Sequence, residues 1–304
     1  MKSASPQAAE ASGAAGKALA DRCRLGLTAL LHACAHGHET VAAMLVAPTN
    51  AAGALDAVGR DGFSALLWAE ERRLDGVAQS LRECGAAAVR RPALTLFRGE
   101  AGAVQVDVNE RTVAFTGSFA TVRSAQRCPL GAKGYYEMEI LEIEKYSRRE
   151  MMLFIGTRFH RYGFATASFE RVLAASNKGL GDDNQSWEVN GRAQKAMHNG
   201  HETDYKCDQW KNGDVIGLAC DLDKMQMHVS HNGSFAAPNG VVFELAPDAV
   251  RDGLFAALTG SSGKVRFNLG GVTFKYAPPS SDFVAFSKFA DEMKADEDVR
   301  IDVT

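Results

Sequence analysis

The side chains best suited to covalent chemistry in this sequence are a cysteine and the histidines before it. Cys207 follows His198 and His201, so the three could be written as a thiol with a nearby base, as in thiol hydrolases. The segment 197–211 that contains them is polar, which predicts a loop, and pairings of this kind are common by chance. A hydrolase that uses Cys207 therefore remains only a weak alternative.

Metal binding is the second chemistry that these residue types could support. His228 falls on an alternating run and His231 in the turn after it, and strand alternation would point the two rings to opposite sides. Asp182, Asp183 and Asn184 offer oxygen ligands, but Ca²⁺ needs six or more oxygens from several places. We expect no metal site and no cofactor, and the usual motifs for phosphate binding or hydrolysis are missing from the sequence.

Composition narrows the class of protein further. The 304 residues suit about two domains, and 46% apolar residues leave ample material for buried cores. A net charge of -3 argues against nucleic-acid binding, which needs a basic face. No stretch is apolar for long enough to cross a bilayer, and six scattered cysteines favour reduced thiols in the cytosol or nucleus.

After a leader at 1–20 that is rich in Ala, Ser and Gly, the sequence repeats itself. Residues 26–33, GLTALLHA, return as residues 62–69, GFSALLWA, a spacing of 36 residues. Each copy leads into a second apolar pattern of helical spacing. The period and the pattern predict a solenoid of helix pairs.

The two copies resemble ankyrin repeats, whose turn and first helix follow the pattern Gly-x-Thr-Pro-Leu-His-x-Ala. The resemblance covers about 22–88, within a predicted helical domain at 21–90, and it departs where alanine replaces proline and leucine replaces histidine. Members of the family bind other proteins through the repeat tips and the concave helix face. By position, the resemblance implies a binding face formed by Arg24, His32, Arg60, Phe63 and Trp68.

Other interpretations of this helical domain stay open. Phe63 and Trp68 could instead be packing residues, since apolar residues at helical spacing are usually core. Two repeats are fewer than the three normally needed for stability. We therefore expect either that the next domain stabilises the array or that a degenerate repeat lies in the leader. The roughly three residues beyond the usual repeat length are expected at 47–55, in an enlarged connecting loop.

From Ala93 the sequence changes to short alternating runs separated by Gly, Asn and Asp. The strongest signal is a hairpin at 214–233. An apolar run is followed by a turn and then by an alternating run, which ends at Asn232 and Gly233. These runs predict an antiparallel β-sandwich with this hairpin at its centre. The expected strands are 94–97, 104–108, 112–115, 135–143, 151–156, 186–189, 215–220, 225–230, 254–259 and 264–269.

An ordered series of motifs in this part resembles a SPRY domain. The motifs are GYYEMEI at 134–140, FIG at 154–156, SWE at 186–188, MHNG at 197–200, DVIGL at 214–218, LFAAL at 254–258 and VRFN at 265–268. Each motif alone is weak, but their joint order across about 93–278 is specific. The resemblance implies a multidomain chain, α then β, in which a short ankyrin-type array precedes a concanavalin-like jelly roll.

In the SPRY family, loops at one end of the sandwich bind a segment or a folded epitope of another protein. By position, the resemblance implies a surface formed by Arg161, Tyr162, Asp182, Asp183, Asn184, Gln185, Trp187, Thr259 and Ser261. Trp187 could instead belong to the core, as most tryptophans do. The stretch that starts at Thr259 lacks the aromatic residue of some peptide-binding members, so their specificity is not implied here.

The residues 279–304 predict a C-terminal helix and an acidic tail. Asp282 could cap a helix on which Phe283, Phe286 and Phe289 recur at helical spacing. We expect this aromatic stripe to dock on the sandwich rather than on a partner.

The sequence as a whole predicts a non-enzymatic interaction protein or adaptor that binds another protein, with no nucleic-acid or membrane partner. A glycan-binding sandwich is the alternative from another class, because lectins share the jelly-roll architecture. The partner's identity and the oligomeric state stay open.

Overall fold

A computed structural model provides the coordinates of the chain. It describes residues 18–19, 21, 27–59, 62–89, 91, 94–99, 102–117, 119–143, 160–169 and 179–289. The chain divides into two compact units, Met1–Ala93 with Val106–Arg111 and Leu94–Gln105 with Thr112–Thr304. The first change of unit, after Ala93, coincides with the change of sequence pattern.

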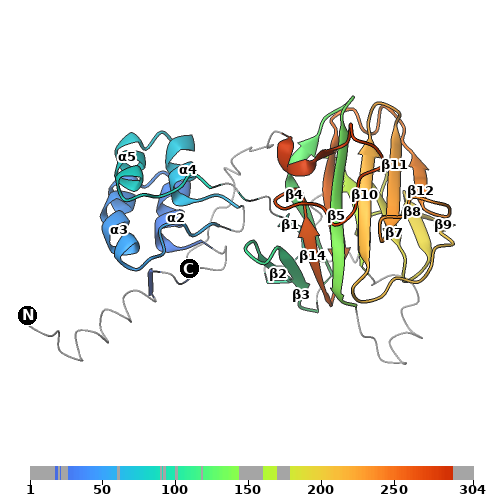
Figure 1. Ribbon diagram of the computed structural model, residues 1–304, viewed down its shortest axis with the longest axis horizontal. Helices are drawn as coiled ribbons and strands as arrows, with labels where there is room; N and C mark the ends of the chain where they lie inside the picture. The colour runs from blue at the N-terminus through green and yellow to red at the C-terminus, as the bar shows by residue number, and fades with distance from the viewer. Residues whose placement is uncertain are drawn as a thin grey trace, which may run out of the picture. The chain divides into compact units, whose positions relative to one another are not determined.

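The described part of the first unit contains four longer helices in two pairs. They are α2 (Ala29–Ala35), α3 (Glu39–Ala51), α4 (Ala65–Glu71) and α5 (Asp75–Glu83) (Figure 1). The equivalent helices pack together, α2 against α4 and α3 against α5. Among the described residues, no helix is both long and apolar enough to span a membrane.

The repeated Thr and Ser explain why the first helix of each pair begins where it does. The Thr28 hydroxyl accepts a hydrogen bond from the Leu31 amide at 3.3 Å, and the Ser64 hydroxyl accepts one from the Leu67 amide at 3.4 Å. Each hydroxyl satisfies an amide that the helix leaves without a partner. The repeat in the sequence therefore corresponds to a repeated N-cap.

The sequence suggested that the extra residues of the first copy form an enlarged loop, but they do not. Helix α3 has 13 residues and α5 has 9, so the additional length of the first copy extends α3 to Ala51, past Pro48 inside the helix. Phe63 and Trp68 are buried with ring centroids 5.0 Å apart. They belong to the helical core, as the alternative interpretation held.

The second unit is a sandwich of two antiparallel sheets. One sheet has the order β1-β4-β13-β6-β7-β8-β9 and the other β12-β11-β10-β5-β14-β3-β2, and β15 pairs with β5 in parallel. The strands of the first sheet are β1 (Leu94–Arg98), β4 (Ala120–Cys128), β13 (Leu254–Gly260), β6 (Arg161–Ala165), β7 (Ser186–Asn190), β8 (Lys195–His198) and β9 (His201–Asp204). Those of the second are β12 (Gly240–Glu244), β11 (Gln226–His231), β10 (Val215–Asp221), β5 (Lys133–Glu142), β14 (Lys264–Asn268), β3 (Thr112–Phe115), β2 (Val104–Asp107) and β15 (Val284–Ala285).

The predicted hairpin forms and lies inside its sheet. Strand β10 lies between β5 and β11 and is buried along its whole length (Figure 1). Asn232 and Gly233, at the turn after β11, both have positive φ angles, 51° and 83°. Glycine and asparagine tolerate this region, which is why the pair occurs there.

Six strands of the described residues are absent from the predicted set: β4, β6, β8, β9, β12 and β15. Strand β6 contains Arg161, which we had assigned to a loop, and β8 and β9 fall in the segment 197–211 and just before it, where the polar sequence predicted a loop. The sheet tolerates these polar residues because β9 is an exposed edge strand and the buried Arg161 side chain pairs with Asp182 in a neighbouring loop. The strand predicted at 151–156 lies outside the described residues.

The C-terminal segment packs on the sandwich, but not as the predicted helix. The described part forms β15 and a short 3₁₀ turn, Phe286–Lys288. Phe286 is fully buried, and its ring centroid lies 5.5 Å from that of Tyr136 and 6.0 Å from that of Phe164. This burial agrees with docking of the aromatic stripe within the chain, and residues 290–304 lie outside the described part.

Candidate functional site

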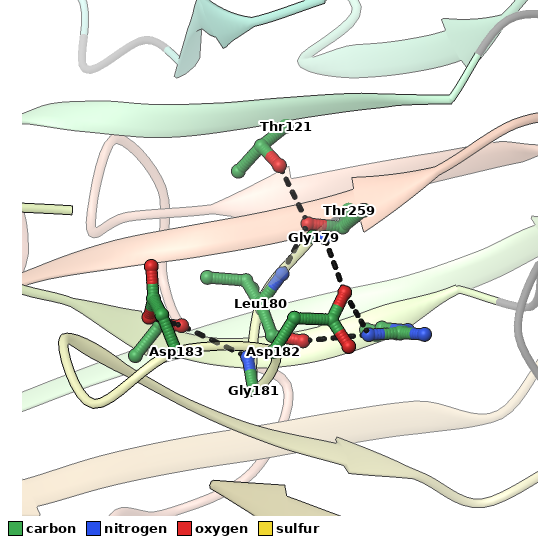
Figure 2. A network of polar contacts seen from close by, with 9 residues as sticks. Thr121, Gly179, Leu180, Gly181, Asp182, Asp183 and Thr259 are labelled. Carbon is green, nitrogen blue, oxygen red and sulfur yellow. Dashed lines mark hydrogen bonds and ion pairs between the residues drawn. The ribbon is translucent and has the colours of Figure 1, made fainter. Parts of the chain in front are cut away.

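The loop Gly179–Ser186, which leads into β7, is held by hydrogen bonds from buried side chains. The Leu180 amide donates to the Thr259 hydroxyl at 3.1 Å, and the Leu180 carbonyl accepts from the Arg161 guanidinium at 2.8 Å. Figure 2 shows Thr259 between Leu180 and Thr121, whose hydroxyl lies 2.7 Å from that of Thr259. The sheet below the loop therefore fixes the loop backbone.

Arg161 also binds the loop through charge. Its Nη1 atom lies 3.0 Å from the Asp182 carboxylate, and only 3% of the Arg161 side chain is exposed. The same carboxylate accepts a hydrogen bond from the Gly179 amide at 2.6 Å. A buried charge is tolerated when it is paired and hydrogen-bonded, so Arg161 and Asp182 together lock the first half of the loop.

Asp183 and Ser186 close the second half of the loop. The Asp183 carboxylate accepts hydrogen bonds from the Ser186 hydroxyl at 2.7 Å and from the Gln185 amide at 3.0 Å. The Ser186 hydroxyl in turn accepts from the Gly181 amide at 2.9 Å. The loop thus forms a closed ring of contacts, which fixes the direction of the residues at its tip.

The loop is also attached to the turn between β8 and β9. The Asn199 amide donates to the Asp183 carbonyl and the Gly200 amide to the Gly181 carbonyl, both at 2.8 Å. His198 at this turn stacks on Trp187, with ring centroids 4.6 Å apart and an angle of 5° between the planes. The loop and the turn therefore form one continuous structure.

The structure changes which residues can contact a partner. Asn184 is exposed, and Asp182, Asp183 and Gln185 are partly exposed, so these four are accessible to a partner and their binding role stays a prediction. The others predicted at this surface, Arg161, Tyr162, Trp187, Thr259 and Ser261, are at most 5% exposed. Direct contact by these five was the wrong prediction, because strands β6, β7 and β13, and the bend that follows β13 at Ser261, place them in the interior.

Arg161 and Thr259 belong to the site in a different way, since their side chains position the loop. Tyr162 lies in β6 with its ring centroid 5.3 Å from that of Trp210, deep in the sandwich. The motif at 186–188 pointed to Trp187, but the adjacent Glu188, buried below the loop, received no role from the sequence. The sequence signal that could have pointed to Glu188 is its position between two apolar residues, Trp187 and Val189, in a predicted strand.

On the predicted helical face, His32 is the one described residue that keeps some exposure, while Phe63 and Trp68 are buried. Arg24 and Arg60 lie outside the described residues. Near His32 the surface carries His36 and Arg72. Burial lowers the pKa of His36, and like charges from His32, His38 and Arg72 lower it further.

The chemistry considered from the sequence finds little support in the geometry. Burial raises the pKa of the Cys207 thiol to about 11, which favours the unreactive thiol over the thiolate. The His231 Nε2 atom lies 2.9 Å from the Asp214 carboxylate. Burial lowers the pKa of His228. Within the described ranges, no group of three or more His, Cys, Asp or Glu side chains is arranged to hold a metal ion.

Comparison with known proteins finds a family match within the second unit. Residues 135–272 match the model of the SPRY domain. Similar solved structures include the SPRY domain of human HERC1, with 15% identity and a TM-score of 0.39 over 54% of this chain and 91% of the other. Another human SPRY domain has 17% identity and a TM-score of 0.41 over 56% of this chain and 98% of the other.

Stonustoxin is also similar, with 15% identity and a TM-score of 0.40. The match covers 58% of this chain and 27% of the stonustoxin chain. The order of motifs, the two antiparallel sheets and the family-model match agree on one assignment. The chain contains a SPRY domain, a type of domain that commonly serves as a protein interaction module, at residues 135–272.

Proposed function

We propose that this chain is a non-enzymatic adaptor that binds another protein through the Gly179–Ser186 loop of its SPRY domain. The main support is that buried side chains fix the loop backbone while Asn184 stays exposed at its tip. A loop that is already ordered loses little conformational entropy on binding. Binding residues are often found on such loops above a rigid scaffold.

The helical unit is part of the same proposal. Its two helix pairs, with equivalent N-caps at Thr28 and Ser64, support the assignment of ankyrin-type repeats. The face near His32 and Arg72 would then offer a second surface for a protein. Phe63 and Trp68 support this face from the core instead of contacting the partner.

The absence of catalysis and the cellular location are also proposed. The buried Cys207, with its raised pKa, supports a structural role for this residue in place of a nucleophilic one. Localisation in the cytoplasm or nucleus rests on the scattered cysteines of the sequence.

Capture of a partner by tagged full-length protein tests the proposal. Asn184→Arg adds bulk and charge at the exposed loop tip, and Asp223→Arg makes a similar change at an exposed turn between β10 and β11. Quantitative mass spectrometry should find a protein that is enriched by the wild type and by Asp223→Arg but lost with Asn184→Arg. Equal enrichment by both variants would place the binding surface elsewhere.

The glycan-binding alternative has its own measurement. A glycan array probed with and without Ca²⁺ would favour it only if a signal appeared and Asn184→Arg removed that signal. We expect no such signal.

A further inference from the structure

Acidic side chains surround the exposed part of the Gly179–Ser186 loop. Asp182 and Asp183 lie in the loop, and Glu202 lies on β9, the exposed strand that follows the turn attached to the loop. Arg161 pairs with Asp182 and lies below the surface. Asp183 and Glu202 form no ion pair with a described residue, and Lys195, the described cation that interacts with Glu202, is paired with Asp204. Among the described side chains, acidic groups therefore outnumber basic groups at this surface.

A fourth carboxyl group lies directly beneath this surface. Glu188 on β7 is 3% exposed, and its Oε2 atom has no hydrogen-bond partner among the described residues. A Cβ atom added at Gly181 would lie 2.5 Å from the Glu188 Cγ, so Glu188 is packed against the underside of the loop. A buried carboxyl oxygen without a partner is costly in either charge state and is an uncommon feature of a folded protein.

The charged groups that face Glu188 come from three different elements. They are Arg161 on β6, Asp182 in the loop and Glu202 on β9. Burial raises the pKa of Glu188 to about 8, the nearby Asp182 and Glu202 add to this rise, and Arg161 opposes it. Glu188 therefore changes charge close to neutral pH, and its Oε2 atom takes no part in the hydrogen bonds that hold the loop.

We propose that the surface over the Gly179–Ser186 loop recognises a cationic segment of a protein partner, and that ionisation of Glu188 strengthens this contact. Asp183 and Glu202 attract the cation from the surface, and Glu188 adds a negative charge from below. The inference rests on the proposed function, because it names the charge of the partner for that same loop.

Proton linkage gives this inference a distinct pH dependence. A bound cation stabilises the ionised form of Glu188 and so lowers its pKa in the complex, which means that binding releases a proton. Affinity then increases as the pH rises toward the pKa of the free protein, about 8, and levels off above it. One linked proton limits the change to about tenfold per pH unit.

A fluorescent peptide of alternating glycine and arginine tests the inference with full-length protein between pH 7 and 9. Arginine keeps its charge over this range. The fluorophore is attached to the amino terminus of the peptide, so that no amine titrates either. Asp183→Asn with Glu202→Gln should weaken binding several-fold. Asp223→Asn, which removes an exposed charge between β10 and β11, should leave binding unchanged.

Glu188→Gln is the decisive variant, because the amide has the shape and the zero charge of the protonated carboxyl. It should bind the peptide like the wild type at pH 7, and its affinity should not increase toward pH 9. Thermal melting of each variant at both pH values verifies that the protein is folded. The same pH slope in Glu188→Gln would overturn the linkage.

Equal weakening by Asp223→Asn and by the Asp183 and Glu202 changes would show binding to surface charge in general and overturn the inference. The capture experiment separates this failure from that of the proposed function. If capture of a partner is lost in Asn184→Arg but the arginine peptide does not bind, the loop is still the binding surface. Only the claim that it recognises a cationic segment is then contradicted.

Discussion

Arg161 and Asp182 lie 3.0 Å apart, from Nη1 to the carboxylate, although Arg161 belongs to an inner strand with 3% of its side chain exposed. The pair connects the interior of the sandwich to a surface loop. Because the guanidinium also donates to the Leu180 carbonyl, one buried side chain holds two positions of the loop, Leu180 and Asp182. The conformation of the candidate surface therefore depends on a residue that no partner can touch.

Arg161→Ala should destabilise the second unit by about 3 kcal/mol, because it removes a buried charge and leaves Asp182 without its partner. Urea denaturation followed by tryptophan fluorescence measures this, and Trp187 and Trp210 both lie in the second unit. Arg251→Ala, at an exposed position, is the control and should cost less than about 0.5 kcal/mol. Equal stability of the two variants would contradict the bracing role of Arg161.

The backbone at Gly181 gives a second prediction. Gly181 has a φ of +82°, and a Cβ there would meet the Glu188 Cγ at 2.5 Å and the Met197 carbonyl oxygen at 2.9 Å. Gly200 has a similar φ of +71°, but its nearest neighbour would lie at 3.9 Å. Gly200→Ala should therefore cost about 1 kcal/mol from backbone strain alone. Gly181→Ala should cost at least about 3 kcal/mol by strain and overpacking together.

Chemical denaturation of these two glycine variants measures the difference. If Gly181→Ala costs no more than Gly200→Ala, the close packing of Glu188 beneath the loop is wrong.

The N-caps of the helical unit give a third prediction. Thr28→Ala should cost about 1 kcal/mol, the usual value for a lost cap. Ser64→Ala should cost more, since the Ser64 hydroxyl also donates to the Ala87 carbonyl at 2.9 Å and accepts from the Val89 amide at 3.0 Å. Far-UV circular dichroism during unfolding measures the helical unit. Ser64→Thr, which keeps the hydroxyl, should restore most of the loss, and the reverse order of the two alanine variants would contradict this account.

The pH dependence of stability gives a fourth prediction, with Glu188 as its source. The native protein holds the Glu188 proton up to a pKa of about 8, whereas the unfolded chain releases it near 4.5. The unfolded state therefore binds fewer protons between these values, and stability falls as the pH rises, by at most about 1.4 kcal/mol per pH unit. Urea denaturation from pH 5 to 8 should show this fall in the wild type and a smaller one in Glu188→Gln. Identical slopes would remove Glu188 as the cause.

Most of the fold could be predicted because its strongest signals are local. The N-cap residues, the buried run of β10 and the turn at Asn232 each act on neighbours in the sequence. Strands β6 and β9 were missed because their polar residues are explained only by distant contacts or by an edge position. The added length of α3 was also missed, since the extra residues were expected in a loop at 47–55 but extend the helix to Ala51, past Pro48.

The candidate site was predicted in part. The exposed loop tip around Asn184 was found, because runs of Asp and Asn indicate surface turns. The burial of Arg161, Tyr162 and Thr259 was not predicted. It depends on which strands lie beside β6 and β13 in the sheet, and the order of residues in the sequence does not show this. Glu188 shows the limit most clearly, since its surroundings come from β6, β7, β9 and the loop together.

The dissociation constant between this protein and a captured partner, measured for the wild type, Asn184→Arg and Asp223→Arg, tests the central claim most directly. The account predicts that Asn184→Arg weakens binding at least tenfold, about 1.4 kcal/mol, with unchanged thermal stability, and that Asp223→Arg binds like the wild type. A dissociation constant that is the same for all three proteins would contradict the assignment of the Gly179–Ser186 loop as the partner-binding surface.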